Sequence, residues 1–189
     1  IDTELGGTTP IDIILTFNKS ENDKNIVSIN ESDDEDILDE DIVIDDLFED
    51  ELKKNSWFTN EKLKIIEQIH LYLEERNEIG KVQSIYTLIE VANLLNNQEL
   101  SIFEISVLYD EIPKDFKKDL IYPYLSTDDN MAKITARVKD SETINRKKLI
   151  TDINNYLLNN YQFDLKDFKV NGLLVLYNNM LQSLFSSQI

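Results

Sequence analysis

Apolar and polar residues alternate along two stretches of the chain, and a period of two is the pattern of a half-buried β-strand. In residues 10–18, PIDIILTFN, the apolar positions are Ile11, Ile13, Leu15 and Phe17. In residues 131–139, MAKITARVK, they are Ile134, Ala136 and Val138. Two shorter strands are predicted in KVQSIYTL, directly after Gly80, and in DFKVNG, which ends at Gly172.

Apolar residues spaced three and four positions apart predict the helices. A first helix follows Thr59 or Asn60, either of which can cap it. Its apolar face consists of Leu63, Ile66, Ile69, His70 and Leu73. Two further helices are predicted over residues 87–96 and 143–160. The last segment predicts another helix, with one apolar face formed by Leu173, Leu176, Tyr177, Met180, Leu181 and Leu184.

The order of these elements is strand, helix, strand, helical insertion, strand, helix, strand. This is the order of a split βαβ, or ferredoxin-like, unit, in which two crossover helices cover one face of an antiparallel sheet. The insertion spans residues 87–125, where Pro113 and Pro123 interrupt a helical pattern. We therefore predict a single α+β domain over residues 1–189, a ferredoxin-like sandwich with a helical insertion and a long acidic loop.

The charge of the chain is concentrated in one segment. Residues 21–51 hold fifteen of the thirty-seven Asp and Glu residues and a single Lys, in a chain of net charge −18. Mutual repulsion predicts an extended, mobile loop, and we assign residues 21–56 to an acidic insertion. Apolar residues within the run, such as Ile37 and Phe48, leave room for part of it to dock on the domain. The net charge opposes binding to nucleic acid or to an anionic lipid surface.

Few residues offer catalytic or metal chemistry. The chain has no Cys and one His, His70, so zinc and thiol chemistry have no basis. No G-x-S-x-G motif suggests a serine nucleophile, and the acidic run lacks the Gly of an EF-hand loop. Gly6 and Gly7 precede a strand rather than a helix, which suits a turn better than a phosphate site. We expect His70 to be a packed or edge residue of its helix, and we expect no cofactor, no bound metal and no enzymatic activity.

Several blocks of sequence resemble one transporter family in the same order along the chain. They are IDTELGGTTPIDIIL, WFTNEKLKIIEQIHLYLEE, IGKVQSIYTLIEVANLLN, LYDEIPKDFKKDLIYPYLS, NMAKITARVKDS and VNGLLVLYNNMLQSLFSSQI. They are similar to a periplasmic loop, or porter domain, of exporters of the resistance-nodulation-division (RND) superfamily, in the branch related to the MMPL and hopanoid transporters. The resemblance covers nearly the whole chain except the acidic run.

The resemblance implies a soluble extracytoplasmic domain of a proton-driven exporter in the bacterial inner membrane. Its partners would be the transmembrane helices and second periplasmic loop of the same permease, and its substrate a hydrophobic or lipid-like molecule. Homo-oligomers of the full-length protein are also compatible with it. Ile1 and Ile189 would each adjoin a membrane helix, with residues 173–189 leading into one of them.

Aromatic density points to one substrate-contact region beside the insertion. We expect an apolar groove formed by Ile102, Phe103, Leu108, Tyr109, Tyr122 and Tyr124. Ordinary core packing is the competing interpretation of these residues, and the more favoured one. Two other functions remain open at this stage. The chain could be an acidic protein-docking or calcium-responsive module, or, with less support, a hydrolase that uses a carboxylate pair.

Overall fold

The computed structural model describes residues 7–17, 57–139, 144–161 and 163–173, together with residues 175, 176, 179, 180 and 183. The acidic run and Gly6 lie outside these ranges, so the predicted acidic loop is not among the described residues. The strands are β1 (Thr9–Thr16), β2 (Ile79–Gln83), β3 (Leu125–Ser126), β4 (Met131–Val138) and β5 (Phe168–Asn171). The helices are α3 (Asn60–Glu74), α4 (Ile85–Asn96), α5 (Ile102–Glu111), α6 (Lys114–Leu120) and α7 (Arg146–Asn160).

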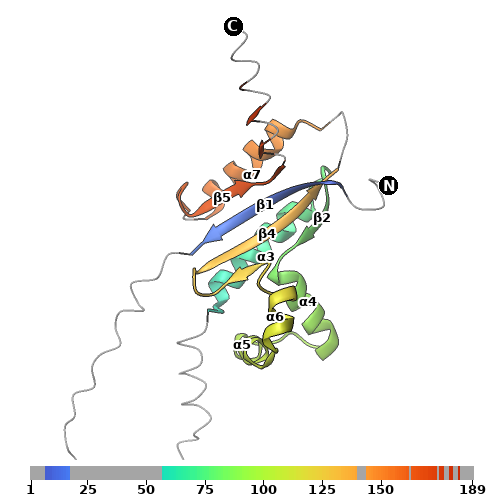
Figure 1. Cartoon of the computed structure of the whole chain (residues 1–189), viewed down its shortest axis with the longest axis vertical. Coiled ribbons are helices and arrows are strands. Elements are labelled where there is room, and N and C mark those ends of the chain that lie inside the picture. The colour runs from blue at the N-terminus through green and yellow to red at the C-terminus, as the bar shows by residue number, and fades with distance from the viewer. Residues whose placement is uncertain are drawn as a thin grey trace, which may run out of the picture.

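The strands form one antiparallel sheet with the order β2-β4-β1-β5, and the short β3 pairs with β4 (Figure 1). The longest pairing joins β1 and β4, from Thr9 opposite Val138 to Thr16 opposite Met131. β1 and β2 therefore run in the same direction on either side of β4, and α3 connects them. All four strands predicted from the sequence are present, and the two-residue β3 was not predicted.

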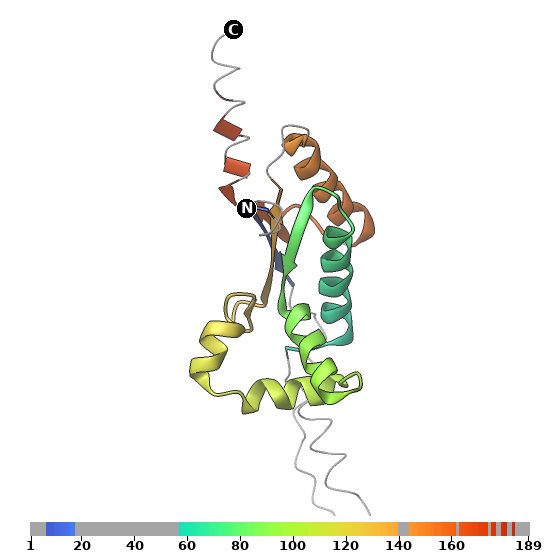
Figure 2. The ribbon, with the colours of Figure 1, turned by 90° about the vertical axis from the view of Figure 1, so that its right-hand side faces the viewer.

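One face of the sheet forms the core, as the alternating patterns predicted. Helices α3 and α7 lie side by side against this face (Figure 2). The strands contribute the buried side chains of Ile11, Ile13, Leu15, Val82, Ala132, Ile134, Ala136, Val138 and Phe168. The helices contribute those of Ile66, Ile69, Leu73, Leu149, Ile153 and Leu157. The predicted α+β class, with an antiparallel sheet covered by two helices, is confirmed.

The helical insertion lies at one end of the sheet and consists of α4, α5 and α6 (Figure 2). Ser84 and Ser101 begin α4 and α5 with capping boxes, in which side chain and backbone satisfy each other's hydrogen bonds. Pro113 occupies the N-cap position of α6, and Asn97 ends α4 in the left-handed conformation. The insertion begins at Ile85, two residues before the predicted boundary, because Ser84 caps the helix there.

Two boundaries near the C-terminus differ from or extend the prediction. Helix α7 begins at Arg146 rather than at residue 143, because the Asn145 side chain accepts a hydrogen bond from the Lys148 backbone N–H and caps the helix. Leu173, Leu176 and Met180 are helical, as predicted, and their side chains are exposed. Within the described residues, no helix combines the length and apolar character needed to span a bilayer.

Gly172 provides a test of the junction between β5 and the last segment. Its φ is +117°, and an added Cβ would lie 2.7 Å from the Pro10 carbonyl oxygen and 3.0 Å from the Ile11 Cα. We expect Gly172→Ala to lower the free energy of unfolding by about 2–4 kcal/mol, through backbone strain and overpacking. The free energy of unfolding is measured by urea titration, with circular dichroism as the signal. The exposed Lys169→Ala on β5 is the control, and equal stability of the two variants would contradict the prediction.

Candidate functional site

The six residues predicted to form a substrate groove are divided between the core and the surface. Ile102 and Tyr109 are partly buried and pack against the core, where the Tyr109 ring meets Phe58 with centroids 5.2 Å apart. Phe103 and Tyr124 are half-buried. Leu108 and Tyr122 are 44% and 51% exposed. Packing therefore accounts for part of the set, and the exposed members belong to a wider apolar area.

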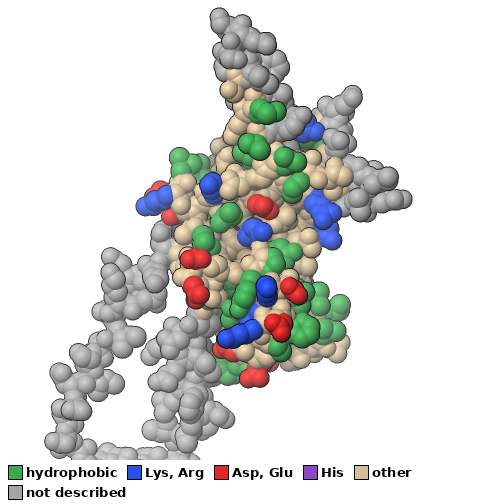
Figure 3. All heavy atoms as spheres, in the orientation of Figure 1, with side chains coloured by type: hydrophobic (Ala, Val, Ile, Leu, Met, Phe, Trp, Pro, Cys, Tyr) green, Lys and Arg blue, Asp and Glu red, His purple; other side chains and the backbone are tan. Residues whose placement is uncertain are grey.

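That wider area covers the outer sides of the three inserted helices, and we call it the insertion surface. It consists of the exposed side chains of Val91, Leu94, Leu95, Val107, Leu108, Phe116, Leu120 and Tyr122. Leu94 and Leu95 are 76% and 78% exposed, and hydrophobic side chains gather over this end of the molecule in Figure 3. Ile85 is the only residue of α4 whose side chain is buried. Exposed apolar area of this kind is typical of a surface that contacts another apolar partner.

A Ser–His–Glu arrangement lies where α3 packs against the start of α4, with His70 and Glu74 on α3 and Ser84 at the N-cap of α4. His70 Nδ1 is 2.9 Å from Ser84 Oγ, and His70 Nε2 is 3.2 Å from Glu74 Oε1. Glu74 can accept a hydrogen bond from Nε2–H, which leaves Nδ1 to accept one from the Ser84 hydroxyl. These are the contacts that orient a nucleophilic serine in hydrolases. No motif in the sequence predicted this arrangement, because its residues come from two separate elements.

The environment of Ser84 indicates a structural role for these three residues. Its side chain has no solvent exposure, and its Oγ accepts the Tyr86 backbone N–H as the cap of α4. His70 is 1% exposed, so a substrate carbonyl cannot reach either side chain without unfolding the helix start. His70 is packed, as predicted, and satisfies its polar atoms by joining α3 to the first turn of α4.

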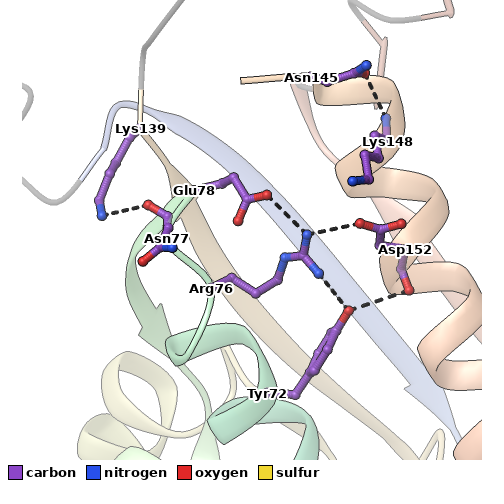
Figure 4. A network of polar contacts seen from close by, with 8 residues as sticks. All are labelled: Tyr72, Arg76, Asn77, Glu78, Lys139, Asn145, Lys148 and Asp152. Carbon is purple, nitrogen blue, oxygen red and sulfur yellow. Dashed lines mark hydrogen bonds and ion pairs between the residues drawn. The ribbon is translucent and has the colours of Figure 1, made fainter. Parts of the chain in front are cut away.

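A second polar network joins α3 to α7 across the core face of the sheet (Figure 4). Arg76 Nη2 lies 3.1 Å from both Glu78 Oε1 and Asp152 Oδ2, and Arg76 Nη1 donates to the Tyr72 hydroxyl at 2.8 Å. Burial lowers the pKa of Arg76, but Tyr72, Asp152 and Glu78 outweigh that effect and raise it. The guanidinium therefore stays charged, and the network fixes the two helices to each other.

Aromatic residues extend this network along α7. The rings of Tyr72 and Tyr156 stack with centroids 3.6 Å apart and planes 2° from parallel. The Tyr156 hydroxyl is 3.3 Å from that of Tyr161, which donates to Gln68 on α3 at 3.3 Å. Burial and the hydrogen bond with Tyr156 raise the pKa of Tyr161. Every partner in this cluster belongs to the domain itself, so the cluster is a helix-to-helix contact.

Cavities and acidic clusters add little to these candidates. A shallow pocket of about 210 Å³ lies at the edge strand β2, between Glu74, Ile79, Gly80, Lys81 and Val82. In the described part of the chain, no three His, Asp or Glu side chains gather where they could hold a metal ion. The insertion surface is therefore a stronger candidate contact region than the pocket or any acidic cluster of the described residues.

The role of Ser84 can be tested against a second helix cap. We expect Ser84→Ala to lower the free energy of unfolding by about 1–3 kcal/mol, because it removes a cap and leaves His70 Nδ1 unpaired. Ser101→Ala, the control, removes an exposed capping box without affecting a buried His and should cost less. Urea unfolding measures both. Labelling of Ser84 in the native protein by a fluorophosphonate would contradict the structural assignment.

Tyr86 predicts how stability responds to alkaline pH. Burial, with contributions from Glu90 and Glu67, raises its pKa from 10.0 to about 12. Above pH 10 the unfolded chain loses this proton and the folded chain keeps it, so stability should fall as pH rises towards 12. We expect Tyr86→Phe to flatten this decline, whereas Tyr122→Phe, at an exposed position, should leave it unchanged. The measurement is the urea midpoint of each variant between pH 9 and pH 12. If Tyr86→Phe lost stability with pH as steeply as the unmodified chain, Tyr86 would not be the cause of the decline.

Comparison with known proteins assigns neither a family nor an activity. No protein-family model, no curated protein sequence and no solved structure matches the chain.

Proposed function

We propose that the chain is a non-catalytic porter domain of a proton-driven RND-type exporter, on the periplasmic side of the bacterial inner membrane. In this role it contributes to the passage of hydrophobic or amphiphilic, lipid-like substrates. The observation that carries the proposal is the insertion surface, because its exposed apolar side chains suit contact with an apolar substrate or with another part of the permease. The sequence blocks that resemble this family support the same function.

The sheet topology supports the ferredoxin-like part of the proposal. With its four main strands numbered in chain order, the sheet reads 2-3-1-4, and α3 and α7 are the two crossover helices. Strands one and two are parallel and separated by the third, and this order supports the proposed split βαβ unit. Porter domains of the proposed family are built from such units, so the sheet topology is compatible with the proposed function.

The proposed mechanism depends on two parts of the domain: the sheet covered by α3 and α7, and the insertion surface at one end of that sheet. Polar and aromatic contacts join α3 to α7, and the His70–Ser84 and Phe58–Tyr109 contacts join the insertion to the same part of the domain. The insertion surface would therefore move with the sheet as one body. In the proposed exporter, this surface packs alternately against substrate and against the second periplasmic loop. Proton-coupled movement of membrane helices would drive the alternation from outside this chain.

Binding of a hydrophobic dye tests whether the insertion surface accepts apolar ligands. We expect N-phenyl-1-naphthylamine to bind saturably, and Leu94→Asp with Leu95→Asp to weaken binding on the order of tenfold, by removing apolar contact. Asn96→Asp with Gln98→Glu is the control, because it adds the same charge to exposed neighbouring positions. Fluorescence titration measures the affinities. Dye binding that is absent, or equally weakened by both pairs, would contradict a ligand-contacting insertion surface.

The wider assignment has an independent test in the gene that encodes this chain. The proposal requires apolar runs of roughly twenty residues encoded on both sides of the sequence, each long enough to span a bilayer. Polar flanking sequence on either side would overturn the exporter assignment. A calorimetric calcium titration addresses the alternative binding module, since stoichiometric, tight calcium binding is not expected of a porter domain.

A further inference from the structure

The face of the sheet opposite the core carries a set of basic side chains. Because side chains alternate along a strand, the residues between the core positions of β1, β2, β4 and β5 point to this opposite face. We call its cationic part the basic sheet face, and it consists of Lys81, Lys133, Arg137 and Lys169. Figure 3 looks onto this face and shows Lys and Arg side chains over the strands. A positive surface is unexpected in a chain of net charge −18.

The strand register arranges these cations in rows across the sheet. Lys133 and Lys169 both pair with Ile14, so the two charges flank one apolar residue of β1. Lys81 pairs with Arg137 in a second row. Between the rows, Asp12 accepts a hydrogen bond from Thr135 Oγ1 at 2.8 Å. Strands lie about 4.8 Å apart, and the two cation rows, four residues apart along β4, lie about 13 Å apart, so one extended polypeptide can reach both rows.

The cations of this face lack partners within the described part of the chain. No ion pair or side-chain hydrogen bond there involves Lys81, Lys133, Arg137 or Lys169. Asp12 is the one acidic residue that the strands place on this face, and Thr135 already engages it. By contrast, Arg76 on the helical side has two carboxylate partners. Four cations against the single carboxylate of Asp12 leave this face positive around half-buried Ile14, which suits an acidic segment that also carries apolar residues.

We propose that the basic sheet face binds the acidic run of the same chain, residues 21–51. The run has fifteen carboxylates and one Lys, and its apolar residues, such as Ile37 and Val43, can contact Ile14 and Met131. The charges are complementary, and a covalent link raises the effective concentration of the run above that of a free partner. This inference concerns a different surface from the insertion surface and does not depend on the exporter assignment.

The points where the run joins the domain suit this contact. The Phe17 and Trp57 rings, which bracket residues 18–56, meet edge to face with centroids 5.7 Å apart. Both connections therefore lie at the end of the sheet where Thr16 pairs with Met131, two residues from the row that contains Lys133. At roughly 3.3 Å per residue, residues 18–56 are long enough to follow β1 along its length and to return.

Zero-length cross-linking tests the proposal on the full chain. A carbodiimide joins Lys amines to carboxylates in direct contact, and mass spectrometry identifies the pairs. We expect residues 21–51 to cross-link to Lys81, Lys133 and Lys169 severalfold more than to two exposed controls, Lys64 on α3 and Lys147 on α7. Lys64 is a stringent control, because it follows Trp57 closely in sequence. The preference should be lost near 1 M salt, where the screening length falls to about 3 Å.

Isotope labelling and anionic vesicles distinguish the run from other occupants. In a mixture of ¹⁴N-labelled and ¹⁵N-labelled chains, the proposal requires that both peptides of each cross-linked pair carry the same isotope, because the contact lies within one chain. Mixed pairs would instead assign the face to a second copy and overturn it. Phosphatidylglycerol vesicles should bind a variant lacking residues 21–51 more tightly than the intact chain, and Lys133→Glu with Lys169→Glu should abolish that gain. Equal vesicle binding by the intact and deleted chains, or equal cross-linking of face and control lysines, would also overturn the proposal.

Discussion

The pairing of β1 with β4 is the contact on which the rest of the domain depends. Its register aligns Ile11 with Ala136, Ile13 with Ile134, and Leu15 with Ala132, so six fully or nearly fully buried side chains share one face. Among the described strands, β5 pairs only with β1 and β2 pairs only with β4, so each outer strand requires this central pair as its template. A shift of β4 by one residue would turn Lys133 and Arg137 toward the core in place of Ile134 and Ala136, and burial of these two cations opposes that shift.

Because the register fixes which residues point to each face, it also separates the surfaces of the molecule by chemistry. The core face is covered by α3 and α7, whose relative position is held by Arg76 between Glu78 and Asp152 and by stacked tyrosines. The opposite face carries the cations, and the apolar insertion surface lies beyond one end of the strands. Arg76 and the tyrosines find their partners within the domain, although the buried Trp57 Nε1 and Arg76 Nε make no hydrogen bond among the described residues. The two outer surfaces differ in chemistry, one cationic and one apolar, and each suits a different kind of contact.

The sequence predicted the parts of this arrangement that depend on local periodicity. PIDIILTF and KITARV show a period of two over enough residues to identify β1 and β4, and the α3 pattern includes the buried His70. The two-residue β3 has no periodicity of its own and exists through its pairing with β4. The observed starts of α4 and α7 differ from the predicted starts because Ser84 and Asn145 cap these helices. Capping determines where a helix begins more strongly than the apolar pattern does.

Sequence periodicity does not predict contacts between separate elements, and these contacts determine the role of each candidate residue. Aromatic density alone could not distinguish Tyr109, which packs on Phe58, from Tyr122, which is exposed. Likewise, the basic residues of KITARVK indicate a polar strand face, but only the register brings Lys169 and Lys133 to either side of Ile14. Ser84 meets His70 only because α3 and α4 pack together, and burial then excludes the catalysis that this geometry suggests. Function in this domain is therefore best sought on the two outer surfaces, because the buried Ser84 and His70 already contact each other and Arg76 already pairs with carboxylates of the fold.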